Sequence, residues 1–99
     1  MSRMHNPPHP GEFLQDIYFR PHDLSVNKVA KQIGVAASTV SRLLNGHSNV
    51  TPDMALRLAQ AFGRSPESWL NMQATHDLWV ARKKVKLPNI DRVKLRKTG

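Results

Sequence analysis

Apolar residues between positions 10 and 84 recur at intervals of three and four, the spacing that places them on one face of an α-helix. In the first such stretch they are Phe13, Leu14, Ile17 and Tyr18. No stretch shows the sustained alternation of apolar and polar residues that is typical of a half-buried strand. The pattern therefore predicts an all-α fold with five helices, over about residues 10–20, 25–33, 37–45, 51–62 and 65–84.

Polar caps, prolines and glycines bound these stretches. Side-chain oxygens that can accept hydrogen bonds from the first backbone amides of a helix are supplied by Ser25, Thr51 and Ser65. The first helical positions, which tolerate proline, hold Pro10, Pro52 and Pro66. Glycines that commonly end a helix follow the last turns, at Gly34, Gly46 and Gly63. These local signals agree with the periodicity.

The second and third predicted helices are separated only by residues 34–36, Gly-Val-Ala. Two short helices joined by a turn of this length with a glycine are typical of a helix-turn-helix. On a helical wheel, one side of the third helix is apolar and holds Val40, Leu43 and Leu44. The opposite side is polar and holds Ser38, Thr39, Ser41, Arg42 and Asn45.

The polar side of the third helix suits the major groove of DNA. Its hydroxyl side chains are short enough for close approach, Arg42 can bond O6 and N7 of guanine, and Asn45 can bond a phosphate or an adenine edge. Lys28 is expected to contact a phosphate, and Ala37 is a weaker candidate for a methyl contact with thymine. An ordinary solvated helix usually exposes Glu and Lys, whereas this side carries no acid. We therefore predict that it meets DNA.

The net charge of +8 adds little to this argument, because the charge lies near the C-terminus. Residues 82–99 hold eight of the 15 lysines and arginines and one of the seven acids. We expect a helix-turn-helix domain over residues 1–84 and a basic, extended or disordered tail over residues 85–99. The tail is either a solvated chain end or a non-specific grip on DNA that steepens the salt dependence of binding.

The fifth predicted helix has two apolar stripes. One, expected to pack on the other helices, holds Leu70, Ala74, Leu78 and Ala81. The other, expected to meet a second copy of the chain or another protein, holds Trp69, Met72, Trp79 and Val80. We predict that Trp69 or Trp79 lies in a dimer contact. The alternative is a groove of the same domain that covers both stripes.

Several function classes are disfavoured. There is no cysteine, so disulfides and thiolate chemistry are excluded. No apolar run is long enough to span a membrane and no leader-like segment opens the chain, so a cytoplasmic protein is expected. His5 and His9 lie four residues apart, but the prolines between them prevent a helix and no third ligand is near. We expect no metal, no cofactor and no enzymatic activity.

The motifs also resemble a known family. The segments Leu24-Ser25, Ile33-Gly34-Val35 and 38–46 (STVSRLLNG) are similar to the lambda-repressor-type (XRE) helix-turn-helix. The segments 9–12 (HPGE), 51–58 (TPDMALRL), 65–71 (SPESWLN) and 77–79 (DLW) are similar to the HigA-type antitoxins. The resemblance covers about residues 5–82. It implies a dimeric five-helix repressor whose cognate toxin is a small ribosome-dependent mRNA endonuclease.

Two positions depart from the family pattern. Ala36 precedes the third helix where the family often has serine, and loss of such a cap costs about 0.5–2 kcal/mol. Val26 stands where related repressors often have a glutamine that contacts phosphate, so Val26 is left out of the predicted site.

The predicted function is sequence-specific repression of transcription by a dimer that binds operator DNA. The resemblance adds that the chain is the antitoxin of a type II toxin–antitoxin module, neutralises an mRNA-endonuclease toxin and autoregulates its operon. Two alternatives stay open. One is a free-standing regulator without a toxin, and the other is a protein-interaction module that does not read DNA.

Overall fold

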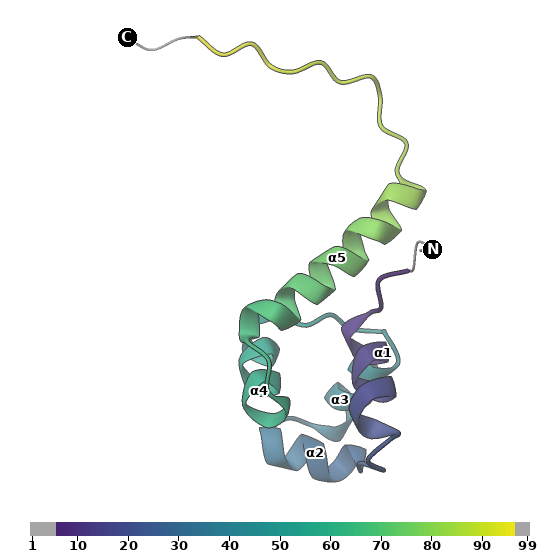
Figure 1. The fold of residues 1–99 in the computed structure, drawn as a ribbon, viewed down its shortest axis with the longest axis vertical. Coiled ribbons are helices and arrows are strands. Elements are labelled where there is room, and N and C mark those ends of the chain that lie inside the picture. Colours follow the sequence, from purple (N-terminus) through teal and green to yellow (C-terminus); the bar gives the residue numbers. More distant parts are fainter. Residues whose placement is uncertain (1–5, 97–99) are drawn as a thin grey trace.

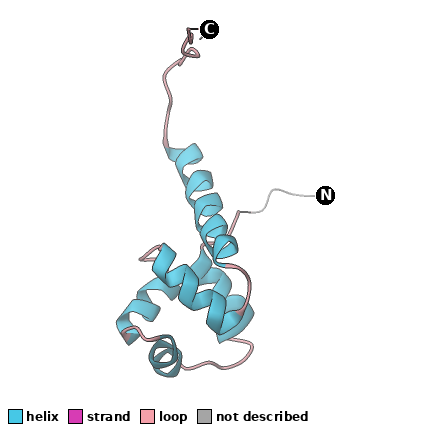
Figure 2. Cartoon of the chain, turned by 90° about the vertical axis from the view of Figure 1, so that its left-hand side faces the viewer, coloured by secondary structure: helices cyan, strands magenta, loops and turns pink. Residues whose placement is uncertain are grey.

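The computed structural model describes residues 6–96, and Figures 1 and 2 show that their regular structure is helical. The helices are α1 (Pro10–Leu14), α2 (Val26–Ile33), α3 (Ala37–Leu44), α4 (Pro52–Phe62) and α5 (Pro66–Lys84), and a π-helical turn, η1 (Gln15–Phe19), continues α1. Within the described residues there is no strand, so the all-α, five-helix prediction is confirmed. None of the described helices is long and apolar enough to cross a membrane.

The three predicted side-chain caps form. Each accepts a hydrogen bond from the backbone amide three residues later, at 3.2 Å for Ser25, 3.2 Å for Thr51 and 3.0 Å for Ser65. Gly34, which follows α2, has a φ of 80° and donates its N–H back to the last turn of that helix. The helix limits therefore follow from local hydrogen bonding, as the sequence predicts.

The first helix departs from the regular α-helix that its sequence predicts. The N–H groups of Arg20 and Leu24 donate to carbonyls five residues earlier, both at 2.9 Å. A turn with this bonding is wider than an α-helical turn and shifts the later residues around the axis. Leu14 and Phe19 consequently both face the core, whereas Ile17, which regular helical spacing places on the same face as Leu14, is 48% exposed. The predicted apolar face therefore loses Ile17.

Helix α1 lies directly against α3 at Gly11. A Cβ atom at this position would lie 1.8 Å from the carbonyl oxygen of Leu43, so only a glycine permits this approach. Around this contact lies one apolar core, formed by Leu14, Phe19, Ala30, Val40, Leu43, Leu44, Val50, Met54, Ala55, Leu58 and Trp69. The outer surface of α3 is held in place by this packing.

Helix α5 begins against α4 and α1 and then leaves the other helices, so that its C-terminal half projects from the domain (Figures 1 and 2). Residues 85–96 continue beyond it without regular secondary structure. Their large apolar side chains are 55–84% exposed. The domain therefore carries one projecting helical arm and a basic extension.

Candidate nucleic-acid interface

Helix α3 has the two sides that its periodicity predicts. Val40, Leu43 and Leu44 are buried in the core. The opposite side is exposed at Ser38, Ser41, Arg42 and Asn45, and Thr39 is half-buried at its border. Ala37 is half-buried and packs against the core, which leaves little of its methyl group for the predicted contact with thymine. Among the described residues, no other segment of the chain buries this side of α3.

The N-terminus of α3 lacks a side-chain cap. Ala36 occupies the cap position with φ −69° and ψ 148°, and no side chain accepts a hydrogen bond there. The backbone carbonyl of Ala36 itself accepts from the amides of Thr39 and Val40, at 3.0 and 3.3 Å. The departure from the family pattern at this position therefore leaves the first amides of α3 without a side-chain acceptor.

Arg42 and Asn45 stand at the C-terminal end of the exposed side. Asn45 is the C-cap residue, and its backbone N–H donates to the backbone carbonyl of Ser41 at 3.1 Å. The Arg42 guanidinium donates through Nη2 to the backbone carbonyl of His47 at 3.3 Å. Arg42 is therefore the single cation on α3, and its side chain lies against the turn that follows the helix.

Helix α2 is placed relative to α3 by a short turn. The N–H of Val35 donates to the carbonyl of Ala30 at 3.0 Å, and Gly34 adopts the left-handed conformation that this turn needs. Lys28 lies near the start of α2 and is exposed. Its side chain is accessible, as a phosphate contact requires.

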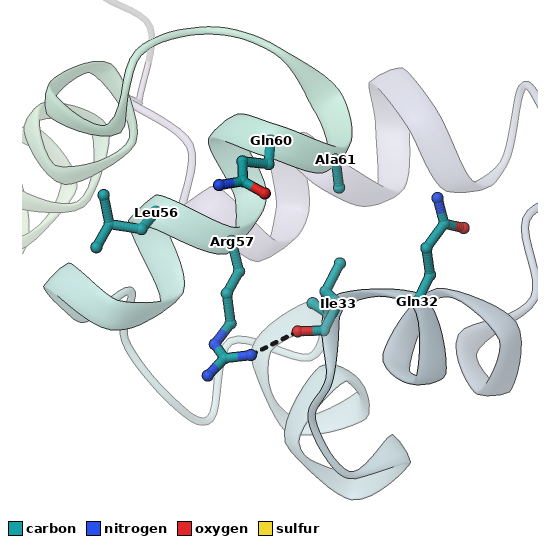
Figure 3. Close-up of a pocket in the computed structure, with 6 residues that line it drawn as sticks. All are labelled: Gln32, Ile33, Leu56, Arg57, Gln60 and Ala61. Carbon is teal, nitrogen blue, oxygen red and sulfur yellow. Dashed lines mark hydrogen bonds between the residues drawn. The ribbon is translucent and has the colours of Figure 1, made fainter.

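A second element holds this turn, and no local pattern in the sequence predicts it. Arg57 of α4 donates through Nη1 to the carbonyl of Ile33 at 2.6 Å and to that of Gly34 at 3.4 Å. Figure 3 shows the guanidinium reaching from α4 to the end of α2. Arg57 thus satisfies carbonyls at the C-terminus of α2 and fixes the helix-turn-helix onto α4.

Arg57 also pairs with Asp53, one turn earlier on α4. The hydrogen bond to Arg57 and its positive charge lower the pKa of the Asp53 carboxyl, and the same hydrogen bond and the negative charge of Asp53 raise the pKa of Arg57. A shallow hollow beside this pair is lined by Gln32, Ile33, Leu56, Arg57, Gln60 and Ala61 (Figure 3). Because the guanidinium is bonded to protein carbonyls and to Asp53, its role here is structural.

The structure corrects the prediction for Trp69. Its side chain is 0% exposed and makes T-shaped contact with Phe13, and its Nε1–H donates to the carbonyl of Gly63 at 3.2 Å. Arg64 lies over both rings, 5.0 Å from the centroid of Phe13 and 5.9 Å from that of Trp69. A fully buried residue offers no surface to a partner, so Trp69 belongs to the core of the monomer.

The face of α5 that packs on the domain also differs from the predicted one. Gln73, a polar residue outside both predicted apolar stripes, is buried. Its Oε1 accepts from the N–H of Val50 at 2.8 Å, and its Nε2 donates to Asn49 and Asp77 at 3.2 and 3.0 Å. Ala74 and Leu78, expected against the other helices, are exposed. Gln73 therefore ties α5 to the segment that follows α3.

Three of the four predicted interface residues retain some exposed surface. Met72 is half-buried and packs against the core. Trp79 and Val80 are half-buried on the projecting half of α5, and Lys83 lies 4.3 Å from the ring centroid of Trp79. Leu78 is 51% exposed beside them. The apolar surface of the arm is therefore centred on residues 78–80.

His9 lies where the N-terminal segment meets α5. Its Nδ1 accepts a hydrogen bond from the N–H of Gly11 at 2.9 Å and so caps α1, while its Nε2 is buried without a partner among the described residues. His76 packs edge-on against it, 5.3 Å between centroids, and bonds the carbonyl of Pro7. Burial, and then the neighbouring His76, lower the pKa of His9, with Asp77 opposing.

We expect the stability of the domain to fall below about pH 6.5, the ordinary pKa of histidine. The unfolded chain binds a proton at His9 near that pH, whereas the folded chain binds it only at lower pH. Between the two values the unfolded state holds more protons, so acidification favours it. Protonation also removes the acceptor at Nδ1. The measurement is the urea midpoint between pH 7.5 and 5.0.

The matched variant is His9→Asn, which keeps a cap acceptor but does not titrate. It should lose less stability on acidification than the wild type. The control is His22→Asn, at an exposed histidine, which should follow the wild-type curve. Equal slopes for wild type and His9→Asn would show that His9 is not the source.

The two histidines that were weighed as metal ligands are His5 and His9. His5 lies outside the described residues, and the His9 Nδ1 is used by the N–H of Gly11. Within residues 6–96, no three His, Cys, Asp or Glu side chains lie close enough to hold a metal ion. His9 and His76 contact each other edge-on, and the Nδ1 atom of each is bonded to a backbone group.

Comparisons with known proteins agree with this architecture. The helix-turn-helix family HTH_3 matches residues 18–69. Virulence-associated protein I of Dichelobacter nodosus is 39% identical over 82 residues, which make up 83% of this chain and 76% of that protein. Antitoxin HigA-1 of Vibrio cholerae serotype O1 is 40% identical over 72 residues, 73% of this chain and 68% of the relative.

Solved structures give the same result. The antitoxin GraA superposes with a TM-score of 0.77 at 37% identity, over 82% of this chain and 87% of GraA. GraA in complex with its operator superposes with a TM-score of 0.76 at 36% identity, over 85% of each chain. The helix-turn-helix around α2 and α3, the five-helix domain and these relatives together show that the chain belongs to the HigA-type antitoxins of the lambda-repressor-like helix-turn-helix family, which are DNA-binding regulators and not enzymes.

Proposed function

We propose that this protein is a sequence-specific DNA-binding repressor that acts as the antitoxin of a type II toxin–antitoxin module and represses its own operon. The observation that carries the proposal is the exposed side of α3, which presents small hydroxyl side chains, one asparagine and one arginine, and no acid. The relative GraA is known in complex with its operator, which supports the same role for this fold here.

The geometry suits reading of bases in the major groove. Helix α3 has eight residues, about 12 Å of length, enough to follow a few base pairs. Ser38 and Ser41 allow the backbone to approach the bases, and Arg42 supplies two N–H donors to O6 and N7 of a guanine. Asn45 and Lys28 are placed for phosphate or base-edge contacts at the two flanks.

A dimer supplies the affinity that one short helix lacks. We assign the contact between copies to the projecting half of α5, where Leu78 is 51% exposed and Trp79 and Val80 are half-buried. Lambda-repressor-type proteins bind paired half-sites about one helical turn apart, and a two-fold axis through such an arm provides the required symmetry. A titration of operator duplex with the protein should give a stoichiometry of two chains per duplex.

The partner beyond DNA is, in this proposal, a small mRNA-endonuclease toxin in the same cytoplasm, encoded beside the antitoxin. This part of the proposal is supported by two relatives, HigA-1 and GraA, which are antitoxins by name. A free-standing regulator would show no co-purifying nuclease from the neighbouring reading frame, whereas an antitoxin would. A pure protein-interaction module would bind that partner but select no DNA sequence.

The central test is Arg42→Ala. The probe is the duplex that the wild-type chain selects from a randomised library, compared with a scrambled duplex of the same composition. Loss of a bidentate contact to guanine should weaken binding to the selected duplex by about ten- to a hundredfold. Binding to the scrambled duplex should change by only a few-fold, because removal of one charge acts on all sequences alike.

The control is Arg82→Ala, which removes the same charge from the last turn of α5, remote in sequence from α3. It should change both affinities by the same factor. If Arg42→Ala leaves the preference for the selected duplex intact, or if the wild type selects no sequence, α3 does not read bases through Arg42.

A further inference from the structure

The turn after α3 bonds Arg42 twice. The Arg42 side chain donates through Nη2 to the carbonyl oxygen of His47 at 3.3 Å. The carbonyl of Arg42 accepts from the N–H of His47 at 2.8 Å, and the N–H of Gly46 donates to Leu43 at 3.0 Å. The guanidinium of the only cation on α3 is thus linked to one backbone carbonyl, and the conformation of residues 45–47 decides where that carbonyl points.

Gly46 makes this conformation possible. Its φ is 75°, in the left-handed region that a side chain disfavours. A Cβ atom added there would meet no atom within 4 Å. Position 46 therefore favours glycine for its backbone angle and not for space, so alanine at this position acts on the turn without creating a clash.

The far end of the same segment is also anchored. The N–H of Val50 and the side chain of Asn49 are both bonded by the buried Gln73 of α5, at 2.8 and 3.2 Å. Val50 itself is part of the core. Residues 45–50 are therefore held at both ends, by the helical bonding of Gly46 and by Gln73, which makes the His47 carbonyl a fixed acceptor.

We propose that the Gly46–His47 turn positions Arg42 for base recognition, with the His47 carbonyl holding the guanidinium in its reading orientation before DNA arrives. This inference rests on the proposed function, in which Arg42 reads a guanine. A guanidinium has five N–H donors. The bond to His47 uses one of the two hydrogens on Nη2. One of these hydrogens lies on the edge shared with Nε and the other on the edge shared with Nη1, so the edge that is not used keeps two free donors for O6 and N7.

The benefit is a smaller loss of side-chain freedom on binding. Arginine is among the side chains with the most rotamer entropy, and a side chain that is already oriented loses less of it when the complex forms. Ordering one such side chain accounts for about a two- to tenfold change in affinity. Because Arg42 contacts bases, this change should be seen with the selected duplex and not with scrambled DNA.

The test compares Gly46→Ala and Gly46→Asn in the full-length chain, with the same two duplexes. Alanine disfavours the left-handed conformation and asparagine tolerates it. We expect Gly46→Ala to lower the preference for the selected duplex by about two- to tenfold, and Gly46→Asn to restore most of it. The control is Gly63→Ala, at a second glycine with positive φ and open space around it but at the α4–α5 junction. It should leave the preference unchanged.

The double variant Gly46→Ala with Arg42→Ala separates this inference from the function on which it rests. If the turn acts through Arg42, the double variant should bind like Arg42→Ala alone. Additive losses, or full preference in a folded Gly46→Ala, would overturn the positioning role while leaving base reading by Arg42 intact. If Gly46→Ala does not fold, the test rests on Gly46→Asn. A loss of preference in folded Gly46→Asn as large as that in Arg42→Ala would overturn the positioning role. A preserved preference in Gly46→Asn supports the positioning role.

Discussion

Gly11→Ala is expected to destabilise the domain by about 3 kcal/mol or more, the upper range for a residue forced into a packed interior. The added Cβ would lie 1.8 Å from the carbonyl oxygen and 2.7 Å from the carbonyl carbon of Leu43. Both are backbone atoms of α3, so no side-chain rotation relieves the clash and the two helices must separate. Since the free energy of unfolding of a native protein is only about 5–15 kcal/mol in total, this change removes much of the stability.

The measurement is urea denaturation followed by circular dichroism. Glu12→Ala serves as the matched control, because Glu12 is the next residue on α1 and is exposed, and surface changes of this kind stay near ±0.5 kcal/mol. The Gly11 variant should also lose operator binding at temperatures where it unfolds. A wild-type midpoint for Gly11→Ala would show that α1 does not lie against α3 as described.

Trp69→Ala is expected to cost about 3–5 kcal/mol, the range for removal of a large buried aromatic side chain. The change empties a fully buried position, removes the edge-to-face contact with Phe13 and leaves the carbonyl of Gly63 without its Nε1–H donor. Arg64 also loses one of the two rings that it covers. The loss should be independent of protein concentration, because Trp69 lies inside one chain.

Trp79→Ala is the informative comparison, since it removes the other tryptophan of the same helix. Trp79 lies on the projecting half of α5 and is half-buried. It should shift the mass in solution toward the monomer, and any loss of stability should grow on dilution. The opposite pattern, in which Trp69→Ala dissociates a dimer of unchanged stability, would assign the contact between copies to Trp69 and contradict its burial.

The limits of the helices could be predicted from the sequence because their causes are local. Ser25, Thr51 and Ser65 cap amides only three residues away, so the signal for each helix start lies within one turn of the chain. The exposed side of α3 could be predicted for a similar reason. Its apolar residues all lie on one side, so only one orientation buries them.

Helix α5 could not be oriented in the same way. It has apolar residues on two sides, and the periodicity gives no preference between them. The choice depends on where α1 and α4 lie, and they bury Trp69 and Gln73 while leaving Leu78 exposed. Similarly, the π-helical turn that exposes Ile17 depends on packing that brings Leu14 and Phe19 to one core.

The sequence by itself therefore determined the number of helices, the starts that their caps set and the polar side of α3, since these depend on neighbours within about one helical turn. Only the tertiary structure decided which side of α5 is buried, how Arg57 holds the turn between α2 and α3, and how Gln73 anchors the segment after α3. Those contacts join residues that are 23 or 24 positions apart in the chain. Local periodicity carries no information about pairings at that separation, because they arise only when the helices have packed.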